Sequence, residues 1–94
     1  MPGKLTLSGH IEVPEADRAA VAAALPEHLR LTRAEPGNIV FTVTPRDGAP
    51  GVYEVYEEFT DRAAFDAHQA RAKGTRWARA AANTVRHYRI TEED

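Results

Sequence analysis

The segment VYEVYEEFTDRAAFDAHQARA, residues 52–72, contains the change of hydrophobic period that decides the fold. In its first eight residues apolar and polar side chains alternate, which is typical of a half-buried strand. A capping residue, Thr60 or Asp61, is followed by alanines, Phe65 and His68 at helical spacing. The segment therefore predicts a strand over 52–59 that leads into a helix, which ends where residues 73–75 break it.

The residues on either side predict three more strands and two more helices. Alternation indicates strands over 4–13, 39–44 and 85–90. A helix is expected from Pro14 to Leu31, kinked at Pro26 and stopped by residues 35–38, where Gly37 suits a left-handed cap. A short helix is expected over 76–83.

The order βαββα(α)β predicts one α+β, ferredoxin-like domain over residues 1–94. Its four-stranded antiparallel sheet would carry helices on one face only. Because the other face is left uncovered, we expect it to pair with a second copy in a homodimer.

Composition excludes several classes of site and partner. The 94 residues contain no cysteine, so no disulfide, thiolate metal site or cysteine nucleophile is possible. Twelve basic and fourteen acidic residues give a charge of −2, without the basic character of nucleic-acid or anionic-membrane binding proteins. The sequence shows neither a signal-peptide pattern nor a membrane-spanning stretch, and we expect a cytoplasmic protein.

Glu57 lies on the predicted apolar side of its strand, together with Val55 and Phe59. A buried carboxylate must pair with a cation, accept hydrogen bonds or have a raised pKa. Two interpretations are open: a structural pair with an arginine such as Arg86, or a general base or proton-holding acid in a pocket.

His68 lies three residues after Phe65 and four before Ala72, on the helix face that should meet the sheet. Such a histidine is commonly a hydrogen-bonded core residue. Combined with Glu57 and the space expected beside Gly9, it predicts a cavity between sheet and helices with an acid/base pair in its wall. Trp77, on the short helix, is expected to cover this cavity and could stack on an aromatic substrate.

His10 and His87 lie on the polar sides of strands that should be neighbours. With Glu54 they could hold a metal ion, but their spacing matches no known ligand pattern, and hydrogen bonding within a dimer interface is expected instead. Walker, nucleophile-elbow and dinucleotide motifs are also missing from the sequence. We therefore expect neither a metal nor another cofactor.

The chain resembles the antibiotic biosynthesis monooxygenase family, which includes small quinol monooxygenases. The resemblance covers nearly the whole chain and rests on Glu35-Pro36-Gly37-Asn38, Phe41, the series Glu57, Phe59, Asp61, Ala64, Phe65 and His68, and the opening Gly9–Val13. It implies a dimeric α+β barrel that oxidises phenols or quinols with dioxygen and without a cofactor. Haem-degrading relatives differ from this chain at the positions of Gly9 and His68.

The resemblance implies that His68 or Glu57 removes a phenolic proton from a small aromatic substrate. The aromatic side chains of Phe41, Phe59, Phe65 and Trp77, together with Arg86, would hold this substrate. Two other functions remain open: an isomerase that uses the same acid/base pair for enolisation, and a ligand-binding protein without turnover.

Overall fold

The computed structural model describes residues 3–93 and contains four strands, three α-helices and one 3-10 turn. In chain order these are β1 (Leu5–Glu12), the turn η1 (Glu15–Asp17), α1 (Arg18–Arg33), β2 (Asn38–Pro45), β3 (Val52–Phe59), α2 (Arg62–Ala72), α3 (Arg76–Ala80) and β4 (Val85–Glu92).

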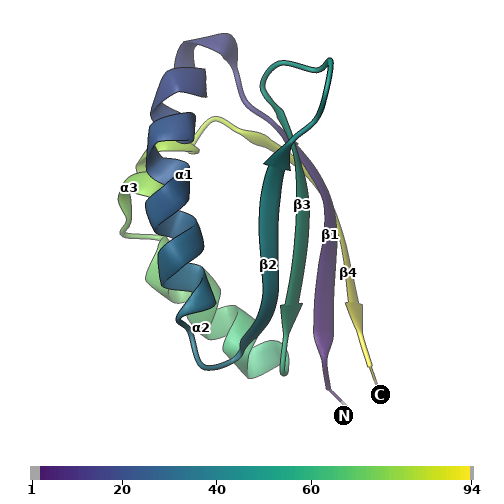
Figure 1. Cartoon of the computed structure of the whole chain (residues 1–94). Helices are drawn as coiled ribbons and strands as arrows, with labels where there is room; N and C mark the ends of the chain where they lie inside the picture. Colours follow the sequence, from purple (N-terminus) through teal and green to yellow (C-terminus); the bar gives the residue numbers. More distant parts are fainter. Residues whose placement is uncertain (1–2, 94) are drawn as a thin grey trace.

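The strands form one antiparallel sheet in the order β2-β3-β1-β4, and the helices cover one of its faces (Figure 1). This arrangement confirms the predicted α+β, ferredoxin-like fold. The first and last described residues lie side by side, since the Gly3 amide donates to the Glu93 carbonyl at 2.9 Å. Among residues 3–93 no helix is long and apolar enough to cross a bilayer.

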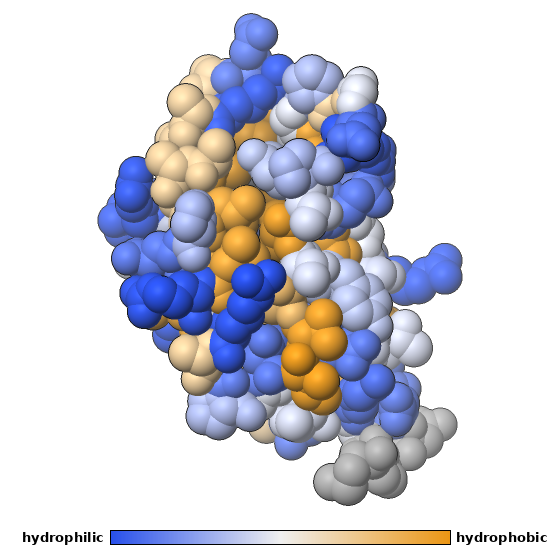
Figure 2. Space-filling model, viewed as in Figure 1, coloured by the Kyte–Doolittle hydropathy of each residue, from blue (hydrophilic) through white to orange (hydrophobic). Residues whose placement is uncertain are grey.

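The core lies between the sheet and the helical layer. Its members are apolar side chains from β1, β2, β3 and all three helices or their ends: Leu5, Leu7, Ile11, Val13, Val21, Phe41, Val43, Val55, Phe59, Phe65 and Ala81. Figure 2 shows hydrophobic surface along the seam between these layers, with hydrophilic side chains on both sides of it. The strand β4 forms one edge of the sheet, and all eight of its residues are exposed in the single chain.

Helix boundaries follow local chemistry. Asp61 begins α2, because its Oδ1 accepts a hydrogen bond from the Ala64 amide at 2.8 Å. The first long helix continues through Pro26 as one element, as expected. The short helix is briefer than expected and ends at Ala80, whereas β4 extends to Glu92.

Two glycines have different roles from those expected. Gly37 has no positive φ; instead, a Cβ placed on it would lie 2.3 Å from the Ala64 Cβ, so it allows α2 to approach closely. A Cβ on Gly9 would lie 1.9 Å from the backbone oxygen of His87. The space beside Gly9 is therefore filled by β4 and does not contribute to a cavity.

Candidate functional site

A cavity of about 230 Å³, here called the inner cavity, lies between the sheet and the helices. Residues of β1, β3, β4 and of all three helices or their ends line it: Leu7, His28, Glu57, His68, Gln69, Ala72, Lys73, Trp77, Ala78, Arg86 and Tyr88. The expected cavity between the layers is therefore present, and Glu57, His68, Trp77 and Arg86 all border it.

Glu57 is held on the inner face of β3, between Leu7 of β1 and Phe41 of β2. Its side chain is 6 % exposed, and Oε1 is buried without a hydrogen-bond partner among the described residues. Burial, and then the charge of Glu35, raise the pKa of Glu57 to about 7. This carboxyl group can therefore hold or release a proton near neutral pH.

Arg86 does not form the structural pair with Glu57 that was one of the two open interpretations. Its guanidinium donates to the backbone oxygens of Thr84, at 3.2 Å, and Ala81, at 3.3 Å. Both acceptors lie where the chain turns from α3 into β4, and these bonds therefore hold Arg86 in the cavity wall at the start of β4.

His68 is oriented by a carboxylate that the sequence analysis assigned to the family motif alone. Its Nδ1 lies 2.9 Å from Oε1 of Glu35, and Oε2 of Glu35 accepts from Nε of Arg71 at 2.8 Å. Arg71 in turn donates to Oγ1 of Thr32 at 3.1 Å. Because a carboxylate only accepts, the proton of neutral His68 lies on Nδ1, and Nε2 carries the lone pair.

Burial lowers the pKa of His68, and the nearby Glu35 only partly opposes this effect. The imidazole is therefore neutral at pH 7, as a general base must be before it accepts a proton. Glu35 would then stabilise the imidazolium that forms, in the manner of a carboxylate behind a catalytic histidine.

His28 is a cavity residue that the sequence analysis missed. Its ring stacks on Trp77, with centroids 4.6 Å apart and planes 4° from parallel, and lies 5.9 Å from the His68 ring. Burial lowers its pKa to about 3, with smaller contributions from His68 and Arg71, so it is neutral. A usable signal was present: Val21, His28 and Thr32 recur at helical spacing on the buried side of α1.

The phenylalanines lie behind the cavity wall. The Phe41 ring contacts both histidine rings, and its centroid lies 5.3 Å from that of His28 and 5.6 Å from that of His68. Phe59 and Phe65 pack edge-to-face with centroids 5.6 Å apart, and none of the three phenylalanines borders the cavity. Their position supports the histidines, whereas Trp77 and His28 present aromatic surface to a ligand.

Cationic and phenolic groups from the end of α2 and from β4 complete the wall. Lys73 and Arg86 bring two positive charges to one cavity although they lie far apart in the sequence. Burial and the Glu57 carboxylate raise the pKa of Tyr88, whose side chain remains 39 % exposed. Its phenol is therefore a hydrogen-bond donor at neutral pH.

A second hollow of about 410 Å³ lies on the other side of His68, beside Pro36, Ala64 and Ala67. Of its polar groups, Glu35 already bonds to His68 and Arg71, and Arg71 also donates to Thr32. Among the described residues, two buried acid/base atoms without hydrogen-bond partners belong to lining residues of the inner cavity, Oε1 of Glu57 and Nδ1 of His28. The second hollow has only one terminal guanidinium nitrogen of Arg71 in that condition, and the rest of this guanidinium is bonded. The inner cavity is therefore the better candidate site.

The family model for antibiotic biosynthesis monooxygenases matches residues 5–83 of this chain. The chain belongs to the antibiotic biosynthesis monooxygenase family. None of the curated protein sequences compared with it matches.

Solved structures of similar fold share little sequence with this family member. SnoaB from Streptomyces nogalater, a cofactor-independent oxygenase, is 17 % identical with a TM-score of 0.77, covering 98 % of this chain and 94 % of its own. PA3566 from Pseudomonas aeruginosa is 22 % identical with a TM-score of 0.78, covering 98 % and 93 %. A conserved Methanosarcina mazei protein is 14 % identical with a TM-score of 0.72, covering 97 % and 93 %.

The motif that marks this antibiotic biosynthesis monooxygenase domain has a physical basis. Glu35 orients His68, and Gly37 lets α2 approach. The Asn38 side-chain amide donates to the Val40 oxygen at 3.0 Å, where the pairing of β2 with β3 shifts register. Asp61 caps α2, which carries His68. The motif residues thus build and position one wall of the inner cavity.

Proposed function

We propose that this protein is a cofactor-independent monooxygenase that oxidises a small phenol or quinol with dioxygen in the inner cavity. The observation that supports this most directly is that Glu57, a buried carboxyl with a free oxygen, and the oriented base His68 border the same cavity. The family and the cofactor-independent oxygenase SnoaB among the structural neighbours agree with this reaction type.

In the proposed reaction, Nε2 of His68 takes the phenolic proton, and Glu35 stabilises the resulting imidazolium. Arg86 and Lys73 favour the phenolate by their charge. The electron-rich ring then supplies electrons to dioxygen, so that one oxygen atom enters the product and the other leaves as water. Glu57, with its pKa near neutrality, is suited to passing protons to and from the reduced oxygen.

The dimensions of the inner cavity favour a small substrate. Its volume of about 230 Å³ is below the range of roughly 300–1,000 Å³ that is common for drug-sized ligands. The flat pair formed by Trp77 and His28 suits one aromatic ring stacked against it. We therefore favour hydroquinones and naphthols over larger polycyclic phenols.

The protein is further proposed to act as a homodimer. Members of the family bind small molecules and are often dimeric. The helix-free side of the sheet, here called the open face, consists of the outward residues of all four strands: Thr6, Ser8, His10, Glu12, Val40, Thr42, Thr44, Val52, Glu54, Tyr56, Glu58, Val85, His87, Arg89 and Thr91. Tyr56 and Val85 leave 38 % and 52 % of their surface exposed there, which a second copy would cover.

An isomerase is the second candidate, because Lys73 and Arg86 could hold an anionic carbonyl compound while Glu57 and His68 move its protons. Oxygen dependence separates the two reactions. Turnover of a carbonyl substrate without oxygen would support the isomerase, whereas oxygen uptake with a quinol supports the monooxygenase. Binding with no turnover of either class would indicate a ligand-binding protein.

The test is oxygen consumption with a panel of hydroquinones and naphthols, with no added cofactor. His68→Ala and Glu57→Gln are each expected to lower turnover by about 10²-fold or more, the scale of a lost acid/base group. Glu58→Gln is the matched control, since Glu58 is the next residue of β3 and bonds to Tyr56 and Lys4 instead. Equal turnover by Glu57→Gln, His68→Ala and Glu58→Gln would contradict the assignment.

A further inference from the structure

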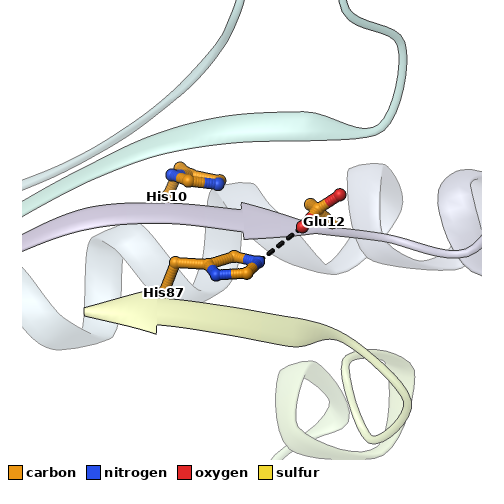
Figure 3. Close-up of side chains that lie close together, drawn as sticks. All are labelled: His10, Glu12 and His87. Carbon is orange, nitrogen blue, oxygen red and sulfur yellow. Dashed lines mark hydrogen bonds and ion pairs between the residues drawn. The ribbon is translucent and has the colours of Figure 1, made fainter.

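The open face carries a group of three side chains that the proposed monooxygenase reaction does not use. His10 of β1 and His87 of β4 lie directly opposite each other in the strand pairing, and Glu12 follows His10 on the same side of β1. Figure 3 shows the three side chains turned toward one another. They lie on the opposite face of the sheet from the inner cavity.

The geometry of this group brings three metal-binding atoms close together. The two imidazole rings are stacked with centroids 4.4 Å apart and planes 20° from parallel. Nε2 of His87 lies 2.5 Å from Oε2 of Glu12. One ligand atom from each of the three residues lies within 4.8 Å of the other two, and no other such group of three occurs among residues 3–93.

Two imidazole nitrogens and one carboxylate oxygen form a ligand set that proteins use for zinc and related divalent ions. Bonds of about 2.0–2.1 Å in tetrahedral geometry place ligand atoms roughly 3.3 Å apart. The side chains of His87 and Glu12 are 46 % and 53 % exposed, so small rotations can bring the atoms to that spacing without repacking the core.

The neighbouring carboxylate, Glu54, is a weaker candidate ligand although it faces His10 across β1 and β3. It accepts a hydrogen bond from Nε of Arg46 at 2.7 Å, and this ion pair occupies it. Within residues 3–93, the only ion pair of Glu12 is with His87. Glu12, which the sequence analysis did not consider, thus replaces Glu54 as the third member of the group.

We propose that His10, Glu12 and His87 bind one divalent transition-metal ion, such as zinc, on the open face of each chain. Three protein ligands leave a coordination position for water, or for a group of a second copy placed on this face. The site departs from the expectation that these histidines only form interface hydrogen bonds. It does not depend on the proposed monooxygenase activity.

The test uses chelator-treated full-length protein titrated with zinc by calorimetry, with the imidazole signals followed by NMR. One ion per chain is expected, with shifts in the signals of His10 and His87. His10→Ala, His87→Ala and Glu12→Gln should each weaken binding by at least about 10–100-fold, the range already known for loss of supporting groups. Glu54→Gln is the matched control and should bind as the native protein does.

Three results would overturn the proposal: no saturable zinc binding, binding that survives in the double variant His10→Ala/His87→Ala, or a larger loss in Glu54→Gln than in Glu12→Gln. The metal-free melting temperature of each variant checks that it is folded. Where His10→Ala or His87→Ala fails this check, His10→Asn or His87→Asn replaces it, because a planar amide suits the same exposed position.

Discussion

Glu57 is buried at an energetic cost that the described residues do not relieve. Its Oε1 has no hydrogen-bond partner within residues 3–93, and the nearby Glu35 raises the pKa of Glu57 further in addition to burial. A purely structural role would leave this cost unexplained, since an apolar side chain would pack there without it. The burial of a free carboxyl in a cavity wall therefore favours a role in proton transfer.

The raised pKa predicts how Glu57 affects stability. In the folded protein the Glu57 carboxyl keeps its proton up to about pH 7, whereas in the unfolded chain the carboxyl loses the proton near pH 4.5. The stabilising contribution of this bound proton to the free energy of unfolding is therefore complete below pH 4.5 and is lost as the pH rises through 7. Relative to the native chain, Glu57→Gln should gain about 3 kcal/mol of unfolding free energy between pH 4.5 and about pH 8.

Urea unfolding at several pH values measures this difference, and Glu58→Gln is the control. Hydrogen bonds from the Tyr56 hydroxyl and Lys4 lower the pKa of the half-buried Glu58, so Glu58→Gln should show no gain in stability as the pH rises. Protonation of His28 at low pH destabilises the native protein and both variants equally, so its effect cancels when their unfolding free energies are compared. A flat difference between Glu57→Gln and the native chain would show that Glu57 is ionised in the folded protein.

At the scale of the elements, the pairing of β1 with β4 depends on Gly9. Its φ of 152° is rarely adopted by other residues, and any Cβ would collide with the backbone oxygen of His87. Because the obstacle is backbone, a side-chain rotation cannot relieve it. The β4 strand, which carries Arg86, Tyr88 and His87, would have to move.

Gly9→Ala is therefore expected to lower the free energy of unfolding by about 2–5 kcal/mol, from strain and overpacking together. Gly74→Ala is the matched control, because nothing lies within 4 Å of its Cβ position and its φ is not positive. That change should be neutral or slightly stabilising. Similar unfolding midpoints for Gly9→Ala and Gly74→Ala would contradict this account of the β1–β4 pair.

The elements themselves were predictable because their signals are local. Alternation in 52–59 and helical spacing in 62–72 depend only on neighbouring residues, and so does the cap at Asp61. The roles of Gly9 and Gly37 were not predictable, because each depends on an element distant in the chain, β4 and α2 respectively. A glycine reports that space is needed, but the sequence does not show what fills it.

At the scale of the whole molecule, the candidate site was predictable in part. The sequence predicted one cavity for Glu57, His68 and Trp77, because strand alternation and helical spacing place the first two on faces that meet between sheet and helices. The Glu35–His68 contact and the meeting of Lys73 with Arg86 required the packing of separate elements. Of the two interpretations open for Glu57, the structural pair with Arg86 does not form, because this arginine bonds to the backbone oxygens of Ala81 and Thr84 before β4.

The open face predicts that the protein forms a homodimer. Lacking helices, it leaves Tyr56 and Val85 exposed in the single chain. A stable interface should bury more than about 1,000 Å² in total, which the outward surfaces of paired sheets can supply. Sedimentation at tens of micromolar, with chelator present to exclude metal bridging, should show the mass of two chains.

Val85→Glu should shift this equilibrium toward the monomer, because it places a new charge where the partner sheet would exclude water. Ala23→Glu is the matched control: it adds the same charge on an exposed position of α1, in the helical layer on the other side of the molecule. If both variants sediment as the native protein does, the dimer forms through another surface. A native chain that sediments as a monomer would show that the polar residues of the open face meet water, as one face of an antiparallel sheet can.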